Sequence, residues 1–167
     1  AEMPGPTFGK LVSRLSSTAR ILYIIYFVMT LVVIFLLWLA GLPLFDSLLL
    51  SFGVAGTGGF GIVNGSIAPY NSVAIELILG IGMLIFGINF NLVFLMVNKE
   101  FKQALKNEEL RWYLRIVGIS IVLISINLVM HAVPVLTSLR DSFFTVSSVI
   151  TTSGFSTALF EHWPMFS

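Results

Sequence analysis

Two short segments, 95 residues apart, carry the most specific chemistry in the sequence. The first is Thr57-Gly58-Gly59-Phe60 and the second is Thr152-Ser153-Gly154-Phe155. Glycine adopts positive φ at little cost, so an extended backbone that contains it can aim its carbonyl oxygens inward. Carbonyl oxygens arranged in this way can replace the hydration shell of a cation. The two segments therefore predict a cation filter built from backbone carbonyls.

The segments belong to an internal repeat. With an offset of 95 residues, 46–61 and 141–156 share six identities in sixteen aligned positions. The same offset pairs Pro69 with Pro164. Internal repeats are a common way to build membrane transport proteins. We expect the unit to be a membrane span, a short helix, a filter strand and a second span, present once in full and once as far as the strand.

A short helix should precede each filter strand. We expect pore helices over about 46–55 and 141–150, and filter segments over 57–61 and 152–156. The apolar run 47–55 would measure about 14 Å as a helix, too short for the roughly 30 Å hydrocarbon core, so it must enter the membrane and turn back. Asp46 and Asp141, each followed by Ser, are expected to cap these helices at the N-terminus. The negative helix ends then face a cation at the filter.

The composition requires a membrane around these elements. Of the 167 residues, 57% are hydrophobic and 10% are charged, whereas soluble domains carry about 25% charged residues. Three stretches are long and apolar enough to span a bilayer, 21–40, 77–97 and 116–135. The absence of Cys excludes disulfides, thiol nucleophiles and Cys-based metal sites. A net charge of +1 gives no reason to expect nucleic acid as a partner.

The distribution of Lys and Arg predicts the orientation. Eight of the nine basic residues flank the spans on one side, and only Arg140 lies on the other. The positive-inside rule then makes 1–20 a cytoplasmic N-terminal segment and 98–115 a cytoplasmic loop. This loop mixes Lys and Glu and resembles a short amphipathic helix. The membrane-spanning repeats are then 21–97, which is complete, and 116–167, which is partial.

Together these motifs resemble the Trk/Ktr/HKT superfamily of potassium transporters, most closely the TrkH type. Supporting stretches are GTGGFGIVNGSIAPYN, EELRWYL and FFTVSSVITTSGFSTALFEHWP. The resemblance covers essentially the whole chain. It implies an all-α integral membrane fold of repeated M1–P-loop–M2 units, with re-entrant pore helices and extended filter strands. The order of motifs resembles the second repeat and most of the third of four.

The resemblance also implies function. The filter carbonyls would be those of Thr57–Phe60 and Thr152–Phe155, with K+ as the transported ion and no other cofactor. Glycine at positions 59 and 154 favours potassium, because serine there is associated with sodium preference in plant relatives. The implied setting is the plasma membrane of a bacterium or archaeon. The implied partners are a homodimeric copy and a cytosolic ring of RCK-type nucleotide-binding subunits, which the 98–115 loop is one candidate to contact.

Several alternatives stay open at this stage. Two filter strands cannot enclose a pore, so either the chain is part of a longer protein or two copies assemble. A sodium-permeable relative and a non-conducting structural subunit both fit the spans, although the latter leaves the paired strands unexplained. An embedded enzyme would have only His131 and Glu76 as ionisable groups at membrane depth. A dinucleotide site at 56–61 requires a helix after the glycines, but a turn-like sequence follows.

Overall fold

The computed structural model describes residues 8–97 and 100–157, and these residues form helices without β-strands. The elements are α1 (Phe8–Leu39), α2 (Leu44–Ala55), the 3-10 turn η1 (Ala68–Tyr70), α3 (Val73–Phe86), α4 (Phe90–Val97), α5 (Phe101–Lys106), α6 (Glu108–Met130) and α7 (Val135–Ile150). This confirms the all-α fold. The expected filter strands are irregular backbone rather than β-structure, because nothing pairs with them as a ladder.

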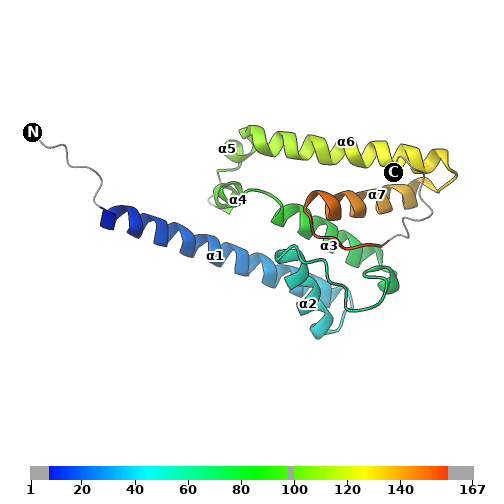
Figure 1. The fold of residues 1–167 in the computed structure, drawn as a ribbon, viewed down its shortest axis with the longest axis horizontal. Coiled ribbons are helices and arrows are strands. Elements are labelled where there is room, and N and C mark those ends of the chain that lie inside the picture. The colour runs from blue at the N-terminus through cyan, green and yellow to red at the C-terminus, as the bar shows by residue number, and fades with distance from the viewer. Residues whose placement is uncertain (1–7, 98–99, 158–167) are drawn as a thin grey trace, which may run out of the picture.

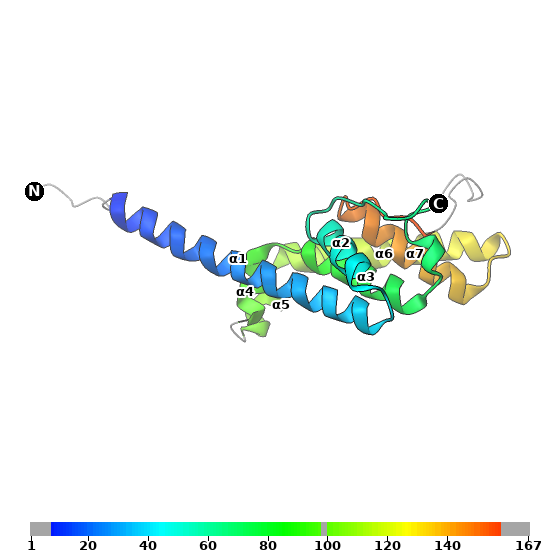
Figure 2. The same ribbon diagram turned by 90° about the horizontal axis from the view of Figure 1, so that it is seen from below.

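The two repeats have the same order of elements. Two helices are long and apolar enough to cross a membrane, α6 and the Ala19–Leu39 part of α1. Each is followed by a shorter helix, α2 or α7, and then by a filter segment. Figure 1 shows α7 doubling back beside α6, while the N-terminal part of α1 projects beyond the other helices in both views (Figure 2).

The short helices begin earlier than the sequence suggested. Pro43 and Pro134 precede α2 and α7, and their carbonyls accept the first helical hydrogen bonds, both at 2.9 Å. Proline has no N–H to leave unpaired at a helix start and its φ suits this position. Asp46 therefore lies inside the first turn of α2, and Asp141 lies in the middle of α7. Neither aspartate caps its helix, and that prediction was wrong.

The second apolar stretch is two helices rather than one span. α3 ends at Phe86, and α4 starts after a turn that includes Gly87 and Asn89. The carbonyl of Asn89 accepts hydrogen bonds from the first amides of α4, at 2.9 and 3.4 Å. With 14 residues, α3 is about 21 Å long. A glycine is an ordinary signal for the end of a helix, and an asparagine is an ordinary signal for the start of the next one. The continuous run of apolar residues around them obscured both signals.

The third span also begins and ends earlier than expected. Asn107 caps α6, since its side-chain oxygen accepts hydrogen bonds from the amides of Glu109 (2.8 Å) and Leu110 (3.3 Å). Glu108 and Glu109 complement the positive end of the helix. The predicted loop 98–115 therefore contains α5 and the first two turns of α6.

One core joins the two repeats. It contains Leu50 and Val54 of α2, Leu79 and Met83 of α3, and Phe155 of the second filter segment. The outward sides of α1 and α6 are exposed and apolar. This is the pattern expected when the surrounding solvent is lipid, since a soluble protein would bury such faces.

Candidate functional site

The two filter segments follow the C-terminal ends of α2 and α7, which stop at the repeat-equivalent residues Ala55 and Ile150. Neither helix has a basic residue in its last turn. The carbonyl end of a helix carries a partial negative charge. Both segments therefore start in a field that favours a cation.

The backbone of the two segments shares an unusual pattern of φ angles. φ is +50° at Thr57 and +63° at Gly59, and it is +58° at Thr152 and +83° at Gly154. The residues between them, Gly58 and Ser153, do not have positive φ. When the sign of φ alternates, successive carbonyls can turn to one side of the backbone, whereas in a regular β-strand they alternate.

The threonines make this pattern costly. A β-branched residue at positive φ is a genuine outlier, and such strain costs about 1–3 kcal/mol per residue. Glycine, which adopts positive φ at little cost, takes one of the two positive φ values in each repeat, and threonine takes the other. Strain at equivalent positions of both repeats points to a functional site rather than to a local defect.

The first two amides of each segment are hydrogen-bonded, whereas most carbonyls are not. The amides of Thr57 and Gly58 donate to the end of α2, and those of Thr152 and Ser153 donate to the end of α7. Within residues 8–97 and 100–157, no hydrogen bond engages the carbonyls of 57–60 or 152–154. The carbonyl of Phe155 differs, because it accepts a hydrogen bond of 2.7 Å from the Ser148 hydroxyl.

The structure brings the two segments together. A Cβ atom added to Gly59 would overlap the carbonyl oxygen of Ser153 and lie 2.9 Å from its carbonyl carbon. Beyond the filters, the amide of Ile67 donates to the carbonyl of Ser156 at 3.0 Å. The amide of Ser156 donates to the hydroxyl of Ser66 at 3.2 Å. Segments 90 residues apart thus form one site.

The filter aromatics behave differently in the two repeats. Phe155 is 2% exposed and its ring packs on Gly53 of α2, where an added Cβ would lie 2.9 Å from the ring. Phe155 thus packs the second filter segment against α2. The equivalent Phe60 is 81% exposed.

Asp46 binds a tyrosine instead of capping a helix. Its carboxylate accepts a hydrogen bond of 2.9 Å from the hydroxyl of Tyr70 in η1. Burial, and then the hydrogen bond and charge of Asp46, raise the pKa of Tyr70 to about 12. This contact ties the start of α2 to the loop before α3.

Glu76 and Arg140 form an ion pair that the sequence did not reveal. Nε of Arg140 lies 2.5 Å from Oε2 of Glu76, and Nη2 lies 2.7 Å from Oε1. The Glu76 side chain is 3% exposed and the Arg140 side chain is 31% exposed. The pair joins α3 of the first repeat to α7 of the second. The signals for it were Arg140, the one basic residue that charge counting separates from the other eight, and Glu76, the acidic residue just before the apolar stretch 77–97.

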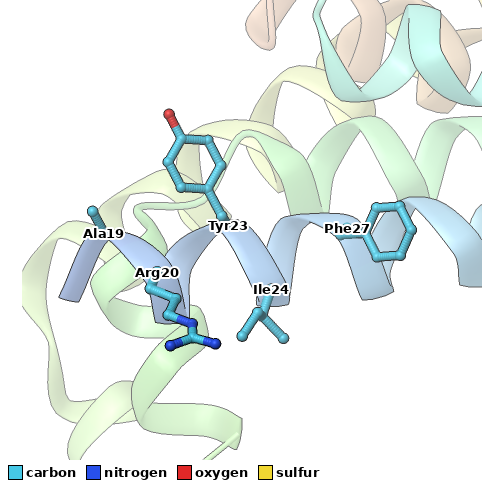
Figure 3. Close-up of a pocket in the computed structure, with 5 residues that line it drawn as sticks. All are labelled: Ala19, Arg20, Tyr23, Ile24 and Phe27. Atoms are coloured by element: carbon cyan, nitrogen blue, oxygen red, sulfur yellow. The ribbon is translucent and has the colours of Figure 1, made fainter. Parts of the chain in front are cut away.

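No other feature of the described residues competes with this site. Among them no three His, Asp or Glu side chains gather as a metal site. A hollow of about 530 Å³ lies along α1 near Arg20, and Figure 3 shows that the side chains lining it all come from that one helix. Tyr23 points away from Arg20, so the hollow is a groove on an exposed helix face and offers no converging oxygen ligands.

Comparison with known proteins identifies relatives of the whole chain. It is 35% identical over 170 residues to the Trk system potassium uptake protein TrkH of Salmonella typhimurium, and 32% identical over 168 residues to TrkG of Escherichia coli. An uncharacterized cation transporter of Methanocaldococcus jannaschii is 32% identical over 144 residues. The alignments cover 99%, 98% and 84% of this chain, and 35%, 34% and 27% of those proteins. The chain thus spans about a third of the length of its bacterial relatives.

A solved structure supports the same relationship. The crystal structure of the potassium transporter TrkH from Vibrio parahaemolyticus matches with a TM-score of 0.87 and 30% identity, over 98% of this chain and 35% of that one. The family TrkH, described as a cation transport protein, matches residues 2–166. With its internal repeat and this match over nearly its full length, the chain belongs to the TrkH family of cation transport proteins.

Proposed function

We propose that this chain forms part of a pore through which K+ crosses the membrane, bound by the carbonyls of Thr57–Phe60 and Thr152–Phe155. The observation that carries the proposal is that the carbonyls of 57–60 and 152–154 accept no hydrogen bond from the described residues, in two segments where the sign of φ alternates. Such oxygens replace the water of a dehydrated cation. The TrkH and TrkG relatives are potassium uptake proteins, which supports K+ as that cation.

We infer that the pore is completed by further repeats. Two filter segments can line only part of a pore, and the relatives are about three times as long as this chain. In this proposal α1 to α4 form one complete M1–P–M2 repeat, and α6, α7 and the segment after them form most of the next. The expected homodimer would then be an association of two complete pores.

The filter glycines provide the test of the proposed function. In liposomes containing the full-length protein, uptake of K+ and Na+ is measured for wild type, Gly59→Ser and Gly154→Ser. Each serine would occupy a positive φ that costs about 1–2 kcal/mol for L-residues, enough to displace a carbonyl. We expect K+ over Na+ discrimination to fall about tenfold or more, which corresponds to about 1.4 kcal/mol.

Gly118→Ser is the matched control, since Gly118 is exposed on α6 and a Cβ there meets nothing within 4 Å. It should leave discrimination unchanged. Unchanged discrimination in both filter variants would contradict the proposal. Equal uptake of K+ and Na+ by the wild type would favour the sodium-permeable alternative, and no uptake of either would favour a structural subunit.

We also propose that the 98–115 loop, which contains α5 and the start of α6, faces the cytoplasm and contacts a nucleotide-binding regulatory ring. Lys102 and Lys106 on α5 are exposed, and α5 packs between α4 and α6 around Ala104. The positive-inside rule supports this orientation in a bacterial or archaeal inner membrane. The charge reversals Lys102→Glu and Lys106→Glu together should weaken co-purification with the ring. Undiminished co-purification would exclude this loop as the contact.

A further inference from the structure

The end of α3 lies directly against the base of the second filter segment. A Cβ added to Gly87 would lie 2.8 Å from Cγ2 of Thr151 and 2.9 Å from the hydroxyl of Tyr113. Gly87 has φ of −76° and ψ of −10°, which any residue adopts. Glycine is therefore required here for space and not for its conformational freedom.

Thr151 connects this contact to the filter. It ends α7 and is 6% exposed, and its hydroxyl donates to the carbonyl of Ser147 at 2.6 Å. The same hydroxyl lies 2.9 Å from the hydroxyl of Ser153, which is 3% exposed. The carbonyl of Ser153 is the group that touches Gly59 of the first repeat. A continuous line of contacts thus runs from Gly87 through Thr151 and Ser153 to Gly59.

The first repeat lacks this arrangement. With the offset of 95 residues, Gly56 and Gly58 occupy the positions of Thr151 and Ser153, so no side chains can form the bridge there. The hydroxyl pair is therefore a feature of the second repeat alone within the described residues. Its position gives it a role beyond general packing, because it fixes Ser153, whose carbonyl oxygen lies nearest to an added Cβ at Gly59.

Tyr113 fastens α3 at the same point. Its hydroxyl donates to the carbonyl of Leu84 at 3.1 Å. That carbonyl is released by the helix ending, since the amide of Ile88 bonds to Ile85 instead. The end of α3 is thereby held between α6 and the base of the filter.

We propose that the end of α3 at Gly87 is a positioning brace for the filter, which holds Thr151 so that its hydroxyl bridge to Ser153 keeps the Ser153 carbonyl against Gly59. The inference rests on the proposed function and adds residues that set the ion selectivity of that site indirectly, by holding the Ser153 carbonyl in place. Neither Gly87 nor Thr151 need touch the ion.

The test uses Gly87→Ala in the full-length protein reconstituted in liposomes. The added methyl must push Thr151, so the ratio of K+ to Na+ uptake should fall several-fold and the KM for K+ should rise. Thr151→Ser keeps the hydroxyl and removes the methyl, so the double variant G87A/T151S should regain the wild-type ratio. Thr151→Val keeps the methyl and removes the hydroxyl, so it should lower the ratio by itself.

Gly82→Ala in the same helix is the matched control, because a Cβ there meets its neighbours at 3.4 Å or more. Size-exclusion chromatography measures the amount of folded protein and so identifies any variant that fails to fold. If G87A folds poorly, the K+ to Na+ uptake ratio of the double variant G87A/T151S decides the test. Two results would overturn the brace and leave the proposed function standing. One is a wild-type ratio of K+ to Na+ uptake in G87A, and the other is rescue of G87A by Tyr113→Phe but not by T151S. If the wild type does not move K+, the proposed function fails and the brace fails with it.

Discussion

The ion pair of Glu76 and Arg140 offers the sharpest test of how the two repeats are held together. Removing one partner of a buried pair leaves the other charge without compensation, at a cost of about 3–5 kcal/mol. Glu76 is 3% exposed and Arg140 is 31% exposed. Arg140→Met would thus leave a carboxylate that water cannot reach, and we expect the full cost. Glu76→Gln leaves a guanidinium that water reaches in part, and we expect about 1–3 kcal/mol.

The pair should be strongly non-additive. In the double variant E76Q/R140M no buried charge remains, so its stability should lie above that of Arg140→Met alone. The assay is the apparent midpoint of thermal unfolding of the full-length protein in detergent, with the four proteins compared under one scan rate. Phe45→Met is the control, because Phe45 occupies the position of Arg140 in the first repeat and is 65% exposed.

Two results would refute this reasoning. If Glu76→Gln destabilised the protein more than Arg140→Met, the relative burial of the two side chains would not govern the cost. If the two single effects simply added in the double variant, the groups would not interact and the bidentate geometry would carry no energy. A midpoint change in Phe45→Met as large as that in Arg140→Met would show that the method does not isolate the ion pair.

Two further predictions concern contacts on the periphery of the site. Tyr70→Phe removes the hydrogen bond to Asp46, and we expect a loss of about 1 kcal/mol in unfolding free energy. The pKa of Tyr70 is about 12 in the folded protein and about 10 when unfolded. Its contribution to stability is therefore complete below pH 10 and is lost as the pH rises to 12. When the free energy of unfolding is measured over this pH range, it should decline less steeply in the variant than in the wild type. Asn107→Ala removes the cap of α6 and should cost about 1 kcal/mol, seen as faster hydrogen exchange confined to the first turn of α6; unchanged exchange there would contradict the capping role.

The sequence predicted those features that depend on local pattern. The offset of 95 residues located both short helices, and α2 and α7 end where that pattern indicates, at Ala55 and Ile150. The first residues of these helices were missed because Asp46 and Asp141, each followed by serine, were interpreted as the start signals in place of the prolines at 43 and 134. The break at Gly87 was missed because hydropathy over a window averages across a three-residue turn.

Other features could not be found in the sequence because distant contacts produce them. Threonine is among the residues least suited to positive φ, and only the surrounding structure can impose it at Thr57 and Thr152. Glu76 and Arg140 are 64 residues apart, and charge counting separated Arg140 from the other basic residues without pairing it with Glu76. The requirement for space at Gly87 likewise depends on Thr151, which comes from the other repeat.

The differences between equivalent residues predict where the rest of the filter lies. Gly59 contacts the second segment and Phe155 is buried against the first repeat, whereas Gly154 has nothing within 4 Å of an added Cβ and Phe60 is 81% exposed. In a ring of repeats each segment has two neighbours, so Gly154 and Phe60 should meet segments from elsewhere in the full-length protein. We therefore expect Gly154→Ala to impair K+ selectivity as severely as Gly59→Ala, and a cysteine at position 60 to resist modification by a water-soluble thiol reagent. If Gly154→Ala were clearly milder, only backbone strain would act there, and the ring would not close against that side of the second segment.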